Sequence, residues 1–259
     1  MKSPLLDPDA RIVIAHRGNS AFAPENTIES LRQALELGAD AVEFDVRVTR
    51  DGVPVLLHDP TLDRTTSGRG QLADVSLGEV RTLDASRGLR TWTGGKLSVP
   101  TLEETLDRFR ETPMVIEVKE MAAAEPTVRL VHKLGLQGKV IVGSGETPVA
   151  ERLYRSGLNA IASRMDALAL LPLAVVGLYL PTPDYQVLSV TPTLGPLPIP
   201  SARLAAAARR MRVPMHVWTV NDAAQAVTLW GHGISGIITD RAAEMLVART
   251  GMRWAGQAP

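Results

Sequence analysis

Short apolar runs alternate with helical stretches along most of this chain, and this alternation is the feature that most restricts its fold. Eight runs have the character of buried strands, and they begin near residues 11, 41, 113, 139, 159, 185, 214 and 236. Helices are expected between them, over residues 28–37, 77–83, 101–110, 126–134, 148–155, 167–173, 201–210, 223–229 and 242–249. Strands that alternate with helices form a parallel sheet with the helices packed outside it. We therefore predict an α/β fold, a TIM (β/α)8 barrel.

The length of the chain agrees with a single barrel. Residues 1–259 are expected to form one domain, because one (β/α)8 barrel commonly fills this length. The alternative fold is an open doubly wound sheet, which carries a glycine-rich nucleotide-binding turn after its first strand. Here the first strand runs into His16-Arg17-Gly18, and no such turn follows it. The barrel is the better prediction.

The stretch from Ala41 to Asp59 has the pattern of a β-hairpin. Two apolar runs flank Asp51-Gly52, a pair that favours a tight two-residue turn. With those residues at the centre of the turn, the facing pairs are Val48 with Val55, Val46 with Leu57, and Asp45 with His58. Glu43 lies two residues before Asp45 and therefore on the same side of the strand. The hairpin thus gathers two carboxylates and an imidazole, a buried charge that a bound cation would compensate.

The second arm of this hairpin, residues 53–58, is expected to be an antiparallel addition and not one of the eight barrel strands. Residues 60–100 follow as an inserted segment with several turn signals. A connection of this length is more often a functional lid or subdomain than a simple loop. Thr101 and Glu104 then have the spacing of a capping box at the start of the next helix.

Polar side chains follow the carboxyl ends of several expected strands. They are His16 and Arg17, Glu43 and Asp45 with His58 from the hairpin arm, Glu117 and Lys119, Trp218, and Thr239 with Asp240. Active sites of (β/α)8 barrels lie at this end of the strands, so we expect these side chains to converge. The chain has no cysteine, so a metal must be bound by oxygen and imidazole ligands. Such hard ligands favour Ca²⁺ or Mg²⁺.

The motifs along the chain resemble those of the glycerophosphodiester phosphodiesterase family. The resembling pieces are His16-Arg17-Gly18, Pro24-Glu25-Asn26-Thr27, Val42-Glu43-Phe44-Asp45-Val46, Val55-Leu56-Leu57-His58-Asp59, Leu62-Asp63-Arg64-Thr65-Thr66, Pro100-Thr101-Leu102-Glu103-Glu104, Glu117-Val118-Lys119, Trp218-Thr219-Val220-Asn221 and Thr239-Asp240-Arg241. They occur in the family's order and span nearly the whole chain. The resemblance implies a TIM barrel that uses a divalent cation to hydrolyse glycerophosphodiesters to glycerol 3-phosphate and an alcohol.

The resemblance also implies a role for each matching residue. Carried over by motif, His16 and His58 become the acid–base pair, Glu43, Asp45 and Glu117 the ligands of Ca²⁺ or Mg²⁺, and Arg17 and Lys119 the phosphate contacts. Trp218 is expected to pack against the substrate. One histidine would take the proton of the glycerol 2-hydroxyl as it attacks phosphorus, and the other would protonate the leaving alcohol. A water would then open the cyclic phosphate with the two roles reversed.

The remaining histidines have simpler interpretations. His132 falls in a helix and His232 in a glycine-flanked loop, with no carboxylate motif near either, so both are expected to be structural. His216 alternates with Trp218 in the seventh strand, which is compatible with core packing or with the wall of the pocket.

Other candidate site residues also have alternative or weaker interpretations. Glu117 and Lys119 lie two residues apart in a strand, a spacing that also suits a plain ion pair on one face. Asp59 and Asn26 are weaker candidates, as residues that orient the histidines and the first loop.

Two stretches depart from the family pattern and bear on the substrate. Ser144 lacks the aromatic neighbour that the family usually places after the fourth strand, and residues 180–200 are unusually rich in proline. The apolar segment Ala167 to Leu180, together with Phe22, suggests an alternative activity, lysophospholipase-D-like hydrolysis of lysophospholipids at the same site. A non-catalytic barrel that binds phosphodiesters is a further alternative, but such a barrel would have no use for the acid–base pair His16 and His58.

Charge and hydropathy restrict the partners. Lys and Arg total 28 and Asp and Glu total 28, so no net charge favours nucleic acid or an anionic membrane as the main partner. The N-terminal residues lack the apolar core of a secretory signal. The window Ala167 to Leu180 is shorter than a membrane-spanning helix and contains Pro172 and Gly177, so stable membrane insertion is not expected. We expect a cytoplasmic enzyme whose partner is a small-molecule glycerophosphodiester, and no oligomeric state is predicted.

Overall fold

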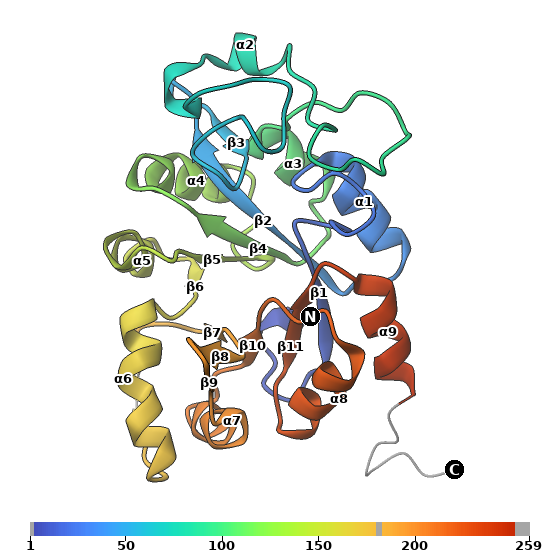
Figure 1. Ribbon diagram of the computed structural model, residues 1–259. Coiled ribbons are helices and arrows are strands. Elements are labelled where there is room, and N and C mark those ends of the chain that lie inside the picture. The colour runs from blue at the N-terminus through green and yellow to red at the C-terminus, as the bar shows by residue number, and fades with distance from the viewer. Residues whose placement is uncertain (1–2, 180–182, 252–259) are drawn as a thin grey trace.

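A curled parallel sheet wrapped by helices is the central feature of the computed structural model, which describes residues 3–179 and 183–251 (Figure 1). In these residues the sheet has eight parallel strands: β1 (Ile12–His16), β2 (Ala41–Val48), β4 (Met114–Val118), β5 (Val140–Gly143), β6 (Asn159–Ala160), β7 (Leu188–Val190), β10 (Met215–Val217) and β11 (Gly236–Thr239). Their order is β6-β5-β4-β2-β1-β11-β10-β7. A parallel bridge between Ile161 and Val187 joins the two ends of this order. The predicted TIM-barrel-like fold is confirmed.

Helices cover the outside of the sheet, as the alternation predicted. They are α1 (Ile28–Glu36), α3 (Leu102–Arg108), α4 (Met121–Lys133), α5 (Thr147–Tyr154), α6 (Arg164–Val175), α7 (Ser201–Arg210), α8 (Ala223–Gly231) and α9 (Ala242–Thr250). Along β1, Val13 and Ala15 belong to the large core shared with the helices, whereas Ile12 and Ile14 belong to a smaller cluster. Successive side chains of a strand point to opposite faces, so these are the outer and inner layers of the barrel. Leu5, from the short 3-10 helix η1 (Pro4–Leu6), joins the inner cluster.

The hairpin exists, but its predicted register is wrong by one residue. The second arm, β3 (Pro54–Leu56), pairs antiparallel with β2 and lies outside the eight barrel strands, as predicted. The observed pairs are Val46 with Leu56, Arg47 with Val55, and Val48 with Pro54. The main chain of Asp45 therefore meets Leu57, whose N–H donates to the Asp45 carbonyl oxygen at 3.2 Å, and not His58.

A longer turn accounts for this difference. The Thr49 N–H donates to the Val53 carbonyl oxygen at 3.1 Å, and the Val53 N–H donates to the Thr49 hydroxyl, also at 3.1 Å. Asp51 accepts hydrogen bonds from the Thr49 hydroxyl and from the Leu77 N–H. Gly52 is the turn residue with a positive φ, 76°. The side chains of Thr49 and Asp51 therefore close a wider loop than the two-residue turn that Asp51-Gly52 suggested.

The inserted segment has a small apolar cluster of its own. Its members come from the second hairpin arm and from the insertion, and they pack against one another: Val55, Leu57, Leu62, Leu72, Val80, Ala85 and Val99. The insertion contains a 3-10 helix, η2 (Leu72–Asp74), and a short helix, α2 (Leu77–Val80), and it lies at the top of Figure 1 above β3. The predicted capping box of Thr101 and Glu104 is present at the start of α3. The apolar cluster therefore packs the insertion against the hairpin arm.

Two other elements differ from the prediction. Helix α4 begins at Met121 and contains Pro126 within it, whereas proline was expected to mark its start. The proline-rich run contains a small hairpin, β8 (Thr193–Leu194) with β9 (Leu197–Pro198), that was not predicted. Residues 180–182, where the predicted apolar segment ends and the proline-rich run begins, lie outside the described residues.

Candidate active site

The end of β1 places a histidine and an arginine at the mouth of the barrel. His16 is the last residue of β1, and Arg17 follows it with a positive φ of 55°. Gly18 has a φ of 86°, and a Cβ there would lie 2.4 Å from the carbonyl carbon of Ser30 in α1. The chain can therefore turn this tightly against α1 only because residue 18 is glycine. This turn directs the Arg17 N–H toward Glu43, whose Oε2 accepts it at 3.1 Å.

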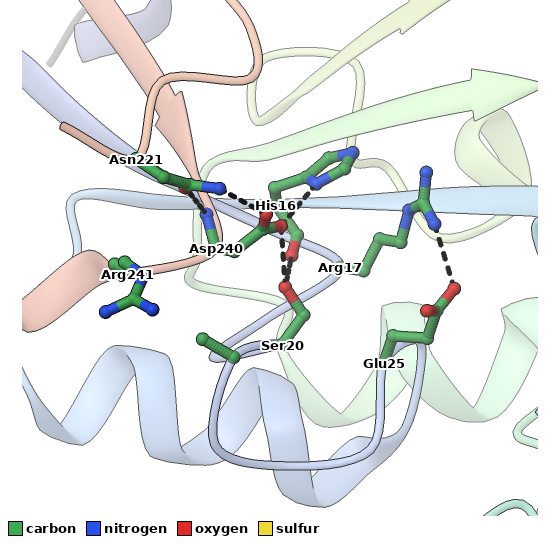
Figure 2. A pocket seen from close by; sticks show the side chains of 8 residues that line it. His16, Arg17, Ser20, Glu25, Asn221, Asp240 and Arg241 are labelled. Carbon is green, nitrogen blue, oxygen red and sulfur yellow. Dashed lines mark hydrogen bonds and ion pairs between the residues drawn. The ribbon is translucent and has the colours of Figure 1, made fainter. Parts of the chain in front are cut away.

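His16 is held by a carboxylate from the last strand of the barrel. Its Nδ1 donates to Asp240 Oδ1 at 2.7 Å, and the same oxygen accepts a hydrogen bond from the Ser20 hydroxyl at 2.9 Å. Asn221 donates from Nδ2 to Asp240 Oδ2 at 2.7 Å. Figure 2 shows these side chains turned toward one another. With Nδ1 engaged in this way, Nε2 is the free ring nitrogen, and it lies 3.9 Å from Glu43 Oε2.

The charges around His16 favour its protonated form. Burial alone would lower the pKa of His16, but the Asp240 hydrogen bond and the Glu43 carboxylate outweigh burial and raise it. The pKa of Asp240 is correspondingly lowered to about 2, because its hydrogen bonds with His16 and Asn221 outweigh the effect of burial.

Three carboxylates converge beside His16. Oxygen atoms of Glu43, Asp45 and Glu117 lie within 4.8 Å of one another, and this group can hold a metal ion. The strand register explains the convergence, because Asp45 pairs with Glu117 across β2 and β4 and His16 pairs with Glu43 across β1 and β2. Neighbouring strands lie about 4.8 Å apart, so paired residues present their side chains together.

The pKa values of two carboxyl groups in this cluster are shifted in opposite directions. Burial, together with the charge of Asp45, raises the pKa of Glu43 to about 8. Burial acts in the same direction on Asp45, but the ammonium of Lys119 and the guanidinium of Arg17 outweigh it and lower the pKa of Asp45. One carboxylate of the cluster thus resists ionisation while its neighbour is held ionised.

Arg17 and Lys119 supply the positive charge at the cluster. Lys119 Nζ lies 2.7 Å from Glu117 Oε2 and 2.9 Å from Asp45 Oδ1, so Lys119 is more than the partner of a single carboxylate. Arg17 Nε lies 3.0 Å from Asp45 Oδ2. The Asn26 side chain binds both the side chain and the main chain of Asp45. Its Nδ2 donates to Asp45 Oδ2 at 2.8 Å, and its Oδ1 accepts from the Asp45 N–H at 3.1 Å. Asn26 therefore orients a carboxylate and not a histidine.

His58 follows the hairpin arm, lies close enough to Asp45 to help lower the pKa of that carboxyl, and has its own carboxylate partner. Its Nδ1 donates to Asp59 Oδ1 at 2.6 Å. Arg64 donates to both Asp59 oxygens, at 2.6 and 3.1 Å, and also donates to both oxygens of Glu25, at 2.6 and 2.9 Å. Glu25 in turn accepts from Arg17 at 2.9 Å. The two histidines thus differ in the surroundings of their carboxylate partners. Asp240, the partner of His16, accepts its other hydrogen bonds from neutral donors. Asp59, the partner of His58, is paired with the guanidinium of Arg64.

Two cavities open beside these residues. The smaller one, of about 340 Å³, is the view in Figure 2 and is lined by His16, Arg17, Asn221 and Asp240, among others. The larger cavity, of about 560 Å³, is lined by His16, Glu43 and Glu117 and by apolar side chains of α6 and of the loop after β7. Trp218 also lines the larger cavity.

Comparison with known proteins decides the family. The model of the glycerophosphoryl diester phosphodiesterase family matches residues 16–244. The chain belongs to this family. A glycerophosphodiester phosphodiesterase of Caldanaerobacter subterraneus subsp. tengcongensis is 34% identical over 237 residues, which are 88% of this chain and 93% of the relative. The predicted enzyme class is therefore confirmed, and the protein is a phosphoric diester hydrolase.

Solved structures of glycerophosphodiester phosphodiesterases share the fold. One from Agrobacterium tumefaciens is 26% identical, has a TM-score of 0.76, and is matched over 92% of this chain and 99% of its own. A phosphodiesterase of Oleispira antarctica, solved in complex with the product sn-glycerol-3-phosphate, is 24% identical with a TM-score of 0.74 over 93% of this chain and 98% of its own. Within the described residues, no helix has the length and apolar character needed to cross a membrane.

Most of the clustered residues were predicted from the sequence, but some of their contacts were not. Asp240, Arg64 and Glu25 all fall in the quoted family motifs, yet only the structure shows the partner of each: His16 for Asp240, Asp59 and Glu25 for Arg64, and Arg17 for Glu25. Asp59 was expected to orient a histidine, and it does contact His58. No periodicity or spacing could have found the pairing of Asp240 with His16, which lie 224 residues apart.

The other histidines have structural contacts. His216 is buried against Gly236 and lines neither of the two cavities, so of its two interpretations core packing is correct. His132 bonds to the Ser156 carbonyl oxygen, and His232 bonds to the Ser201 hydroxyl. Both agree with the expected structural role.

Proposed function

We propose that this enzyme hydrolyses glycerophosphodiesters to glycerol 3-phosphate and an alcohol, with a divalent cation and with His16 and His58 as the acid–base pair. The observation that carries the proposal is the cluster of Glu43, Asp45 and Glu117 beside the free Nε2 of His16. The product bound to the Oleispira antarctica phosphodiesterase, sn-glycerol-3-phosphate, supports this choice of reaction.

The three carboxylates fit a hard divalent cation. Their donor atoms are all oxygens, which suits Ca²⁺ or Mg²⁺. The buried Asp45 Oδ1 contacts the Lys119 ammonium at 2.9 Å, and a carboxylate oxygen has a second lone pair with which it could bind a cation. Burial and repulsion already raise the pKa of Glu43, and a cation would relieve that repulsion. When bound, the ion would neutralise charge on the phosphodiester and polarise its oxygens.

The chain's own residues supply the proton transfers. Asp240 fixes the tautomer of His16, which leaves Nε2 to exchange a proton with substrate, and Asp59 does the same for His58. In the first step one histidine takes the proton of the glycerol 2-hydroxyl as its oxygen bonds to phosphorus. The other histidine gives a proton to the alcohol oxygen as that P–O bond breaks. A water then opens the cyclic phosphate while each histidine performs the reverse transfer.

The cations beside the cluster suit a phosphodiester, which is anionic throughout the reaction. Arg17 and Lys119 already lie within 3.0 Å of Asp45, so their charges are fixed in place before substrate binds. Preorganised charge of this kind stabilises the transition state without reorganisation. Trp218 lines the larger cavity and offers an indole face for the substrate.

Release of glycerol 3-phosphate from a panel of glycerophosphodiesters, with and without a chelator, tests the reaction and its metal. We expect turnover of glycerophosphocholine that a chelator removes and that Ca²⁺ or Mg²⁺ restores. Activity that is insensitive to chelation would remove the cation from this mechanism.

Variants of the two histidines test the acid–base pair. His16→Ala and His58→Ala should each lower kcat by about 10²–10⁴-fold, while calorimetric titration shows metal affinity within a few-fold of wild type. Near-normal turnover by either variant would contradict the assignment.

A second candidate activity is lysophospholipase-D-like hydrolysis of lysophospholipids at the same site. The specific observation in its favour is the apolar wall of the larger cavity, to which Leu168, Leu171 and Ile199 contribute. Side chains of this kind suit an acyl chain better than a small polar alcohol. Rates on glycerophosphocholine and lysophosphatidylcholine, measured with the same enzyme preparation, decide which substrate is preferred.

A further inference from the structure

Exposed apolar side chains gather at the end of the barrel that carries the active site. Phe22 follows β1, Met165 follows β6, Leu194 and Leu197 follow β7, and Trp218 follows β10. The carboxyl ends of the parallel strands meet at one end of a (β/α)8 barrel, so the loops that carry these residues share one face of the molecule. We call these five residues the apolar rim. Isolated exposed apolar residues are common on soluble proteins, but a group around one opening indicates an interaction surface.

The apolar rim is continuous with the larger cavity. Leu194 and Trp218 are exposed and also line the cavity beside His16, Glu43 and Glu117. Leu194 belongs to the small hairpin of β8 and β9, which Figure 1 shows between α6 and α7. Apolar side chains therefore continue from the rim into the cavity, where an apolar chain could follow them.

Charged side chains are few along the part of the rim that Met165, Leu194 and Leu197 form. Residues 185–202, which carry Leu194 and Leu197, contain no charged side chain. Arg164 is exposed next to Met165 and forms no ion pair within the described part of the chain. The nearest carboxylate in sequence, Asp166, accepts hydrogen bonds from Ser163 and Tyr154. One free guanidinium thus lies beside the rim, where it can meet an anionic group.

We propose that the apolar rim docks this enzyme on a phospholipid surface, with the mouth of the active site facing the lipid. A folded protein or a second copy seated on the rim would cover the opening through which substrate enters, whereas a lipid surface leaves substrate able to enter. Phe and Trp side chains settle at the boundary between headgroups and acyl chains. Arg164 complements the headgroup phosphates. The contact is peripheral, so the balanced net charge and the absence of a spanning helix in the described residues do not oppose it.

Sedimentation with vesicles of equal parts phosphatidylcholine and phosphatidylglycerol tests this docking without any turnover. The rim variant is the double substitution Phe22→Ser with Leu197→Ser, at residues whose side chains are 54% and 68% exposed. Because each substitution removes apolar area from the lipid contact, we expect vesicle affinity to fall at least about tenfold. Arg164→Gln should weaken binding to these vesicles more than to pure phosphatidylcholine vesicles.

The matched control is Val176→Ser with Val247→Ser. These residues are 69% and 71% exposed, but they lie at the carboxyl ends of α6 and α9. Barrel helices run back against the strands, so these ends are at the opposite end of the barrel. The control variant should bind vesicles within about twofold of wild type, because exposed apolar area away from the rim does not contact the lipid.

Turnover separates docking from catalysis. Phe22 and Leu197 line neither cavity, so the rim variant should hydrolyse glycerophosphocholine at the wild-type rate, which also shows that it is folded. Absent vesicle binding by the wild-type enzyme, or equal losses in the rim and control variants, would overturn the proposal. A wild-type dimer that the rim variant loses, seen by analytical ultracentrifugation without vesicle binding, would overturn it in favour of self-association. Failure of glycerophosphodiester hydrolysis would leave the vesicle result standing, because binding is measured independently of turnover.

Discussion

Asp240 and His16 form the contact in the site that most directly links geometry to catalysis. Asp240 accepts the Nδ1 proton of His16 and is itself held by the neutral donors Ser20 and Asn221. The carboxylate therefore orients the imidazole and raises its pKa, because no cation among these partners offsets its charge.

Asp240→Asn should lower kcat about 10- to 100-fold while KM changes little, because Asp240 acts through the orientation of His16. The limb of the pH profile that belongs to His16 should move to lower pH, since the carboxylate that raises its pKa is gone. The measurement is kcat and kcat/KM as functions of pH. Ser20→Ala, which removes a neutral donor to the same carboxylate, serves as the control and should lower kcat by less than about threefold. A change confined to KM would contradict the positioning role.

Asn26 is the corresponding positioning residue for the carboxylate cluster. Its side chain forms two hydrogen bonds with Asp45, and its φ of 56° is tolerated by glycine. Asn26→Gly should therefore keep the loop but weaken Ca²⁺ or Mg²⁺ binding about 10- to 100-fold, as measured by calorimetric titration. Asn19→Gly in the same loop is the control, because the Asn19 side chain contacts Gln33 and not the cluster. Equal metal affinity in the two variants would contradict the role given to Asn26.

At the scale of elements, the loop between β1 and α1 depends on one glycine. Gly18 combines a φ of 86° with a close approach to Ser30, and the loop it forms carries Arg17 and Asn26. Gly18→Ala should lower the free energy of unfolding by about 2–4 kcal/mol, because backbone strain and a steric clash add. Gly52→Ala has a similar φ of 76° with nothing within 4 Å, so it should cost only about 1–2 kcal/mol. Urea unfolding of the two variants compares them, and equal losses would show that the approach to Ser30 relaxes freely.

The same scale shows where sequence patterns succeed. The strands at Ile12–His16 and Gly236–Thr239 and the helix at Ser201–Arg210 lie where their patterns predicted, because each has an unbroken period and a clear stop signal. The hairpin register failed because side chains of Thr49 and Asp51 closed a wider turn. Turn length is decided by such local hydrogen bonds, which the pair Asp51-Gly52 alone does not specify.

At the scale of the whole molecule, His216 makes the stability of the folded protein depend on pH. It is buried in the barrel with the Leu5 backbone close to its ring, and neither ring nitrogen forms a hydrogen bond of ordinary geometry among the described residues. Burial lowers the pKa of His216 to about 4 from its usual 6.5. The native state therefore keeps this ring neutral under conditions in which the unfolded chain protonates it.

Stability should consequently fall as pH drops from about 6.5 toward 4. In that range the unfolded state binds a proton at residue 216 that the native state excludes. This difference in proton binding should lower the free energy of unfolding by about 3 kcal/mol. Urea unfolding at pH values from about 7 to about 4 measures it. His216→Phe removes the titrating group, so its stability should fall less over this interval than that of wild type. Parallel losses in both proteins would show that His216 does not contribute.

The sequence by itself determined the periodic and local features of this protein. Alternating strands and helices specified a barrel, and strand-end residues such as His16, Glu43 and Glu117 marked its active face, because parallel strands all deliver their carboxyl ends to one side. Only the tertiary structure decided the contacts between distant segments. Asp240 meets His16 because β11 pairs with β1 in a fixed register, and the apolar rim exists because loops from four strands meet at one opening. Such contacts depend on how the sheet closes, and no single stretch of sequence encodes that closure.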